Sequence, residues 1–103
     1  MRMGEVRLAV LHRDGAVCAF CGCWGDTIDH ILSRAERRRQ GISAYDDRYI
    51  VVACKRDNLR KGTRRLIPPS WAHRQAELEE LTNKQWQVWA GDPRELGAEK
   101  VLL

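Results

Sequence analysis

Long apolar runs are missing from this chain. Its 103 residues contain no stretch near the roughly 18 consecutive apolar residues that a membrane-spanning helix requires, so we expect no membrane association. Residues 1–15 carry charges throughout and lack the apolar centre of a secretory signal peptide. A disulfide-linked secreted protein is therefore not expected, and we predict a cytoplasmic protein whose cysteines are reduced.

Internal repeats, low-complexity tracts and arrays of zinc fingers are also missing. A chain of this length is expected to form one modest core, and such small chains often add a metal or disulfides to it. Because no recognition helix is apparent either, the sequence indicates no preference for particular bases of a nucleic acid. We therefore expect a single small domain whose core is stabilised by a bound metal or by disulfides.

Charge is present but unevenly placed. Residues 1–74 hold 15 Lys and Arg against 8 Asp and Glu, whereas residues 75–103 hold 3 against 6, within a net charge of +4. A basic front and a mildly acidic tail are typical of proteins that bind a phosphate backbone. A solvated surface with no partner gives the same balance, so charge alone does not decide.

Hydrophobic spacing predicts helices and strands in the first two thirds of the chain. A short helix is expected over residues 5–13, ended by a turn at Asp14-Gly15. One strand is expected to end near residues 27–30, and the β-branched run 49–52 predicts a buried strand. The arginine-rich segment 31–41 is expected to be helical or irregular and to close at Gly41. A short helix around residues 58–62 completes this part.

A longer helix is expected in the last third. Pro68-Pro69 breaks the chain, Ser70 is a suitable N-cap, and the pattern predicts an amphipathic helix to about Ala90. Its apolar face would consist of Trp71, Leu78, Leu81, Trp86, Val88 and Trp89. We expect this face to pack on the core. The alternative is a surface for a homodimer or protein partner, anchored by Trp71, Trp86 and Trp89.

The cysteines are spaced as in a zinc site. Cys18-x2-Cys21 is followed by Cys54-x2-Asp57, the layout of two knuckles that hold one tetrahedral ion, with Asp57 where a fourth cysteine is usual. A carboxylate is a harder ligand than a thiolate, so Cys23 is kept as the alternative fourth ligand. A redox pair is disfavoured because the sequence context of a thioredoxin is missing and Cys54 would have no role.

Asp29-His30 combines a hard oxygen ligand with an imidazole. These are the groups needed to hold Mg²⁺ or Mn²⁺ beside a base that deprotonates water near neutral pH. Neighbouring residues of a regular strand face opposite sides, so joint action requires the strand to bend or end at His30. The pair alone is weak evidence for a catalytic site, because an Asp-His pair is more often a surface pair or contains a core histidine whose hydrogen bonds are already satisfied.

Three blocks in order resemble the HNH endonuclease family: residues 11–22 (LHRDGAVCAFCG), 29–31 (DHI) and 49–62 (YIVVACKRDNLRKG). The resemblance covers about residues 8–65. It implies an α+β fold, a small ββα-metal core with two zinc knuckles and an N-terminal helix. Residues 1–67 would form this nuclease core, and residues 68–103 a helical extension packed on it.

The resemblance implies a DNA endonuclease that hydrolyses phosphodiester bonds, with His30 as general base and one catalytic Mg²⁺ or Mn²⁺ on Asp29 and Asn58. A structural Zn²⁺ would be held by Cys18, Cys21, Cys54 and Asp57. Small proteins of this kind are similar to those of bacteria and their phages. The family's middle Asn falls at Tyr49. That departure and Asp57 keep open the alternative of a non-catalytic, zinc-braced DNA-binding module.

Basic residues near these blocks are candidate contacts to DNA phosphates, because their groups neutralise backbone charge without reading sequence. The candidates are Arg34, Arg37, Arg38, Arg60, Lys61, Arg64 and Arg65. Arg60 and Lys61 are favoured because they follow Asn58 within the motif. Each of the others is individually better explained as ordinary solvated surface.

Overall fold

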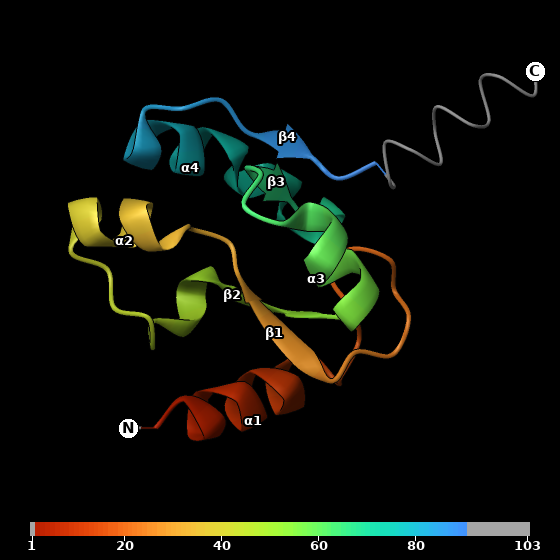
Figure 1. Cartoon of the computed structure of the whole chain (residues 1–103). Coiled ribbons are helices and arrows are strands. Elements are labelled where there is room, and N and C mark those ends of the chain that lie inside the picture. The colour runs from red at the N-terminus through yellow and green to blue at the C-terminus, as the bar shows by residue number, and fades with distance from the viewer. Residues whose placement is uncertain (1, 91–103) are drawn as a thin grey trace, which may run out of the picture.

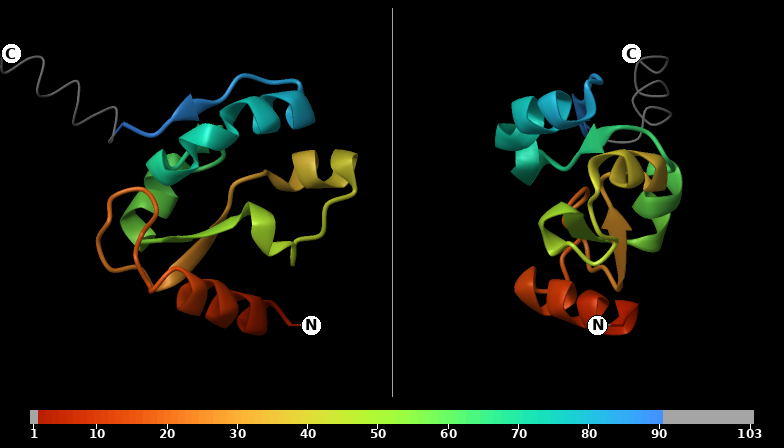
Figure 2. Two further views of the ribbon diagram at one scale, coloured as in Figure 1. Left: turned by 180° about the vertical axis from the view of Figure 1, so that it is seen from behind. Right: turned by 90° about the vertical axis from the view of Figure 1, so that its left-hand side faces the viewer.

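The computed structural model describes residues 2–90. A two-stranded antiparallel sheet lies at the centre, with β1 (Thr27–His30) paired to β2 (Ile50–Ala53) so that His30 faces Ile50 in register. Figures 1 and 2 show α1 (Met3–Arg13) on one side of this sheet and the C-terminal elements on the other. The expected small α+β fold is confirmed at this level.

The face of the sheet toward α1 is apolar. Val6 and Val10 of α1 pack against Ile50 and Val52 of β2, with Ile28 of β1 beside them. These strand residues share one face because side chains alternate along a strand. The predicted helix at residues 5–13 and the predicted buried strand at residues 49–52 are therefore confirmed to within two residues. Tyr49 itself belongs to a short 3₁₀ turn, η1 (Asp47–Tyr49).

The opposite face of the sheet forms the larger core. Val51 and Ala53 pack there with Phe20 of the cysteine turn and with Leu78 and Trp86 from the C-terminal part. Residues before and after the predicted boundary at 67/68 thus share one hydrophobic core. No helix between residues 2 and 90 is long and apolar enough to cross a membrane.

Two short helices begin and end with clear capping groups. In α2 (Arg34–Gln40), Ser33 and Glu36 form a reciprocal capping box, and Gly41 ends the helix with a positive φ of 66°. The predicted end of the arginine-rich segment at Gly41 is confirmed. Cys54 caps α3 (Lys55–Lys61), which begins three residues earlier than the expected 58–62 and stops at Gly62.

The predicted long helix over residues 70–90 is wrong. The chain instead forms the 3₁₀ segment η2 (Pro69–Arg74), the helix α4 (Gln75–Thr82) and the strand β4 (Gln87–Val88), which pairs in parallel with β3 (Leu66–Ile67). Asn83 leaves the helix in the left-handed conformation, with φ 55°. This exit turns the apolar residues that follow back onto the core. They are therefore buried, as the apolar pattern indicated, but without continuing the helix.

The tryptophans of this region are mostly internal. Trp86 is 2% exposed, its indole N–H donates to the Thr82 hydroxyl at 2.9 Å, and Trp89 meets Phe20 edge-on with ring centroids 5.3 Å apart. Packing on the core, the favoured expectation, is confirmed. Trp86 and Trp89 cannot anchor a partner surface because they are buried, and Trp71 is half-buried. The remaining predicted extension, residues 91–103, lies outside the described residues.

Candidate metal centre and the adjoining pocket

Four side chains converge where the cysteine turn meets the start of α3. The ligand atoms of Cys18, Cys21, Cys54 and Asp57 all lie within 4.8 Å of one another. Cys18 Sγ is 3.5 Å from Asp57 Oδ2, and Cys21 Sγ is 3.8 Å from Cys54 Sγ. Three sulfurs and a carboxylate at such distances could hold a metal ion such as zinc.

Local backbone structure brings these ligands together. The turn from Cys18 to Cys21 closes through a hydrogen bond from Gly22 N to Cys18 O at 2.9 Å, and Gly22 has a φ of 79° that suits glycine. Ala19 N donates to Val52 O of β2 at 2.9 Å, which fixes the turn to the sheet. On the other side, Cys54 Sγ accepts from Asp57 N as the cap of α3.

Asp57, and not Cys23, completes the cluster. Cys23 is exposed and lies outside the group, although its carbonyl accepts a hydrogen bond from Cys18 N at 2.7 Å. Asp57 is 2% exposed, and Arg56 reaches it only at 3.7 Å from a largely exposed side chain. A buried carboxylate among thiols needs a compensating cation, so the donor set fits a metal ion.

Protonation of the cluster opposes metal binding. Burial raises the pKa of the Cys21 thiol, with the nearby Asp57 carboxylate adding to it, and burial also raises the pKa of Cys54. Burial also raises the pKa of Asp57, but hydrogen bonds from the three thiols and the charge of Arg56 outweigh this, so the pKa of Asp57 is lowered. In the metal-free protein the Cys21 and Cys54 thiols are therefore protonated near neutral pH, and a bound metal must displace those protons.

A second group lies in a pocket of about 250 Å³ beside β1 and the end of α3, and Asp29, His30 and Lys61 all line it. Asp29 and Lys61 are 7% and 2% exposed, with Lys61 Nζ 3.1 Å from Asp29 Oδ2. This contact lies outside hydrogen-bonding geometry, so Asp29 Oδ2 has no hydrogen-bond partner among residues 2–90. Burial raises the pKa of Asp29, and the charge of Lys61 only partly opposes the rise.

His30 is held by one ring nitrogen. Its Nε2 is 2.8 Å from the Ala44 carbonyl oxygen, and because a carbonyl only accepts, Nε2 carries the proton in this contact. The neutral ring then keeps its lone pair on Nδ1. β1 ends at His30, as joint action with Asp29 required, and the next residue is fixed by Ile31 N donating to Tyr49 O at 2.9 Å.

Asn58 lies on α3, against β1. Its Nδ2 donates to Ile28 O at 3.2 Å, one residue before Asp29, but Asn58 does not line the 250 Å³ pocket. The structure therefore brings Asp29, His30 and Lys61 into one pocket and leaves Asn58 outside its lining. The Lys61–Asp29 pair was not predicted, although Lys61 follows Asn58 by three residues and so shares its helix face.

The predicted phosphate contacts differ in what they already bind. Lys61 is buried on Asp29 and is not a surface group, contrary to the expectation that favoured it. Arg65 Nε pairs with buried Glu36 at 2.9 Å, and Arg37 donates to Leu32 O at 2.7 Å. Arg64 donates to the carbonyls of Lys61 and Arg60. Arg34 and Arg38 are exposed, and Arg34 and Arg37 line the Asp29 pocket.

Comparison of the chain with protein-family models, with curated proteins and with solved structures returns no match. The candidate site therefore stands on its own geometry and on the resemblance of its motifs.

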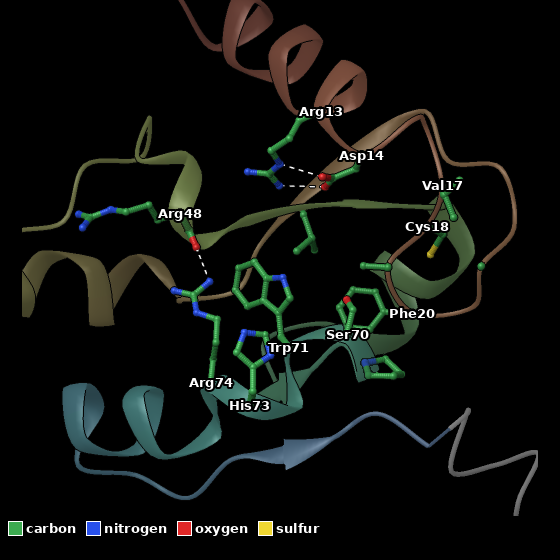
Figure 3. A pocket seen from close by; sticks show the side chains of 14 residues that line it. Arg13, Asp14, Val17, Cys18, Phe20, Arg48, Ser70, Trp71, His73 and Arg74 are labelled. Carbon is green, nitrogen blue, oxygen red and sulfur yellow. Dashed lines mark hydrogen bonds and ion pairs between the residues drawn. The ribbon is translucent and has the colours of Figure 1, made fainter.

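Sequence reasoning missed a larger cavity of about 860 Å³ between the end of α1, the cysteine turn and η2 (Figure 3). Trp71 forms part of its wall, and the Arg74 guanidinium carbon lies 4.1 Å from the centroid of that indole. The cavity could not be foreseen because its lining combines part of the motif at residues 11–22 with segments around Arg48 and residues 69–74, and no local pattern indicates that these segments adjoin.

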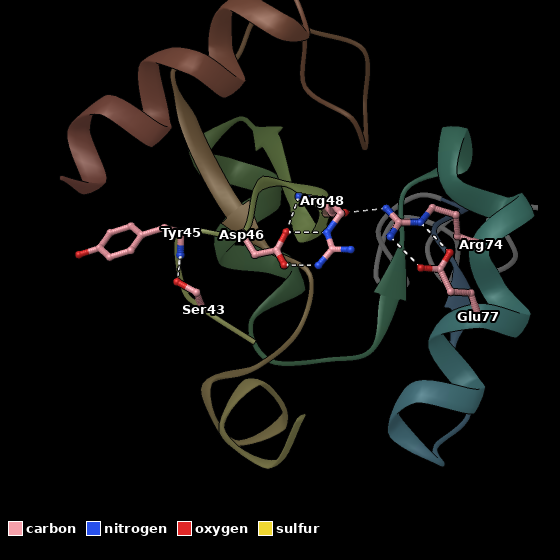
Figure 4. Close-up of polar contacts among 6 residues, drawn as sticks. All are labelled: Ser43, Tyr45, Asp46, Arg48, Arg74 and Glu77. Atoms are coloured by element: carbon pink, nitrogen blue, oxygen red, sulfur yellow. Dashed lines mark hydrogen bonds and ion pairs between the residues drawn. The ribbon is translucent and has the colours of Figure 1, made fainter. Parts of the chain in front are cut away.

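The arginines of this larger cavity already have anionic partners. Arg13 is 2.8 Å from Asp14, and in Figure 4 Arg48 contacts Asp46 while Arg74 contacts Glu77 and the Arg48 carbonyl. Their charges are thus largely compensated by neighbouring side chains. The Asp29 pocket differs in that its ion pair is buried, and Asp29 Oδ2 contacts Lys61 outside hydrogen-bonding geometry.

Proposed function

We propose that the protein is a metal-dependent DNA endonuclease of the HNH type, acting in a bacterial or phage-infected cytoplasm. The observation that carries the proposal is the pocket shared by Asp29 and His30 at the end of β1. The order β1, β2, α3 supports it, as does the contact of Asn58 with the strand that carries Asp29. Together these features agree with the ββα arrangement that the motif resemblance implies.

Two oxygen donors beside the end of β1 suit a hard divalent ion. Asp29, which lines the pocket, offers a buried carboxylate oxygen whose contact is the Lys61 ammonium at 3.1 Å, and Asn58, outside the pocket lining, has an amide oxygen while its amide nitrogen donates to Ile28 O. Mg²⁺ and Mn²⁺ prefer such oxygen ligands. When bound by Asp29 and Asn58, the ion would stabilise the negative charge that develops on the scissile phosphate and the leaving oxygen.

His30 is the proposed general base. The Ala44 carbonyl holds the Nε2 proton, so the ring orientation is fixed and Nδ1 accepts a proton from the water that attacks phosphorus. In the family the middle Asn steadies this loop, and here that position is Tyr49. Tyr49 O still accepts from Ile31 N, which supplies a backbone tether next to the base.

A structural zinc and a basic surface complete the proposal. Zinc on Cys18, Cys21, Cys54 and Asp57 would hold the first turn of α3, and Asn58 is the next residue of that helix. Arg34 and Arg38 are exposed on α2, and Arg34 also lines the pocket, so these residues are proposed to contact DNA phosphates. Arg37, Arg60, Arg64 and Arg65 remain candidates for the same role.

The test is nicking of supercoiled plasmid DNA with Mg²⁺ or Mn²⁺. We expect cleavage by the zinc-loaded protein and a loss of at least about 100-fold in His30→Ala, because the base is removed. His12→Ala is the matched control, since His12 is an exposed histidine of α1. Both variants should keep their zinc content and melting temperature. Undiminished nicking by a clean His30→Ala preparation would reject His30 as the base.

A non-catalytic DNA-binding module is the second candidate. It is favoured by Lys61, whose ammonium neutralises the carboxylate that a catalytic ion would need. This alternative expects salt-sensitive binding of duplex DNA, with no cleavage by any of the Mg²⁺, Mn²⁺ and Ni²⁺ forms. Plasmid nicking that depends on both a divalent ion and His30 would decide against it.

A further inference from the structure

Lys61 is an internal cation at the proposed ion site. It is the last residue of α3, its side chain is almost fully buried, and its Nζ lies 3.1 Å from Asp29 Oδ2. A buried ammonium requires an anionic partner, and among residues 2–90 Lys61 pairs with Asp29. In the absence of a divalent ion, the protein thus satisfies the Asp29 carboxylate with its own positive charge.

Lys61 and a divalent ion would compete for the same carboxylate. Two cations within a few ångströms of one oxygen repel each other strongly in a site with little water. The competition favours Lys61 because its ammonium is tethered by the end of α3 and is always present. Loading of an ion on Asp29 and Asn58 therefore requires Lys61 to find another anion.

The pocket provides a place for that other anion. Arg34, Arg37 and Thr63 line it together with Lys61, so an entering phosphate meets several donors there. The lysine stem has four rotatable bonds and carries a compact point charge, which allows the ammonium to change partner without moving the helix. Gly62, the next residue, ends α3 with a φ of 57°, so Lys61 stands at the terminus of the helix.

We propose that Lys61 couples DNA binding to ion binding, by leaving Asp29 for a DNA phosphate and so freeing the carboxylate for the divalent ion. This inference rests on the proposed function. Because the coupling is a difference in binding free energy, it is reciprocal: DNA tightens ion binding, and the ion tightens DNA binding. Lys61 is thus a positioning residue through which the site binds its divalent ion when DNA is present.

The test measures Mn²⁺ binding by electron paramagnetic resonance, in zinc-loaded full-length protein with and without a short DNA duplex. A His30→Ala background prevents cleavage, so the readout is binding alone. Lys61→Met is compared with Lys61→Gln and with Lys55→Met, whose lysine is exposed on the same helix. Circular dichroism and zinc content establish that each variant is folded, and Lys61→Gln serves if Lys61→Met does not fold.

Without DNA, we expect the Lys61 variants to bind Mn²⁺ about 10-fold more tightly than the parent, because a competing charge is gone. DNA should tighten Mn²⁺ binding about 10-fold in the parent and in Lys55→Met, and less than about 2-fold in the Lys61 variants. Equal Mn²⁺ affinity with and without Lys61 would overturn the inference and leave the nuclease standing. Absence of Mn²⁺ binding in every variant, or binding that survives Asp29→Asn unchanged, would overturn the proposed ion site itself.

Discussion

The two ends of α3 handle negative charge in opposite ways. At its start, Cys54 and Asp57 meet two further cysteines, and within residues 2–90 the cation paired with the carboxylate is Arg56, at 3.7 Å from a largely exposed side chain. At its end, Lys61 already contacts Asp29 inside the protein. At the first end, a metal ion bound from outside would balance the clustered donors. The second is balanced by the protein until a competitor arrives.

This difference teaches how one short helix can serve two purposes. Seven residues are too few for a stable isolated helix, so α3 depends on what holds its ends. A metal at the start would fix the helix, whereas the pair at the end can exchange partners. We therefore expect changes at the start to affect folding and changes at the end to affect ion binding and activity.

The largest effect should come from the start of α3. Cys18→Ser replaces a buried ligand, and we expect loss of bound zinc and of cooperative unfolding, because binding energy of a structural zinc is folding energy. Metal analysis and thermal unfolding measure both. Cys23→Ser, an exposed cysteine outside the cluster, is the matched control and should change neither. Full zinc content in Cys18→Ser would break the comparison.

The second effect belongs to the proposed ion ligand between the two ends. Asn58→Ala should reduce plasmid nicking at least about 100-fold, since the second oxygen donor is lost. It also removes the hydrogen bond to Ile28 O, which costs only about 1 kcal/mol of stability. Zinc content should stay constant. Loss of zinc together with activity would show that the metal cluster at the start of α3 and the proposed ion site cannot be changed independently.

A third effect is the pH dependence of zinc binding. Because burial raises the pKa of the Cys21 and Cys54 thiols, these protons are bound below and around neutral pH and must leave when metal binds. Zinc affinity should therefore fall as pH falls, by at least about 10-fold per unit between pH 8 and pH 6. Competition with a chromogenic chelator measures it. A flat profile would show that the thiols are already ionised.

The smallest effect concerns the ion pair between Glu36 and Arg65, which serves as a reference for the Lys61–Asp29 pair because no metal ion is proposed to compete for it. Burial raises the pKa of Glu36, but hydrogen bonds from Arg65 and Ser33 outweigh it, so its pKa lies below the usual 4.5. A lowered folded pKa means that the stabilisation is present above pH 4.5 and is lost as pH falls through the lower value.

Glu36→Gln should thus cost about 1–2 kcal/mol at pH 7, a figure reduced because Arg65 is partly exposed. The difference from the parent should shrink in acid. Urea unfolding at pH 7 and pH 3.5 tests this. Arg38→Gln, on the exposed side of α2, controls for removing a charge from that helix. A cost that is the same at both pH values would assign the loss to the capping box alone.

Local chemistry explains which features were predictable. Gly41 and Gly62 end their helices as expected, and the close spacing of Cys18 and Cys21 places two ligands in one turn, whereas Cys54 reaches them because β2, which it follows, pairs with β1 and binds that turn. The choice between Asp57 and Cys23 could not be made from spacing. It depends on the cysteine turn leaving Cys23 exposed and outside the cluster, while the first turn of α3, capped by Cys54, carries Asp57 into it.

Long-range packing explains what was missed. The apolar residues from Trp71 to Trp89 fit helical spacing, yet Asn83 ends the helix and Trp86 and Trp89 are buried from extended backbone. The backbone hydrogen bonds between β4 and β3 stabilise this arrangement, and hydrophobic periodicity carries no information about them. Similarly, Lys61 was read as a surface cation because nothing local signals that its ammonium meets a carboxylate on a strand 32 positions away.

The contact between Phe20 and Trp89 gives the molecule a natural optical signal. Phe20 lies inside the Cys18–Cys21 turn, and the Trp89 indole rests edge-on against it. Loosening of that turn would let water reach the indole and move its emission to longer wavelength. If metal binding tightens the turn, a change in Trp89 emission, superimposed on that of Trp24, Trp71 and Trp86, would report occupancy of the cluster in unlabelled protein.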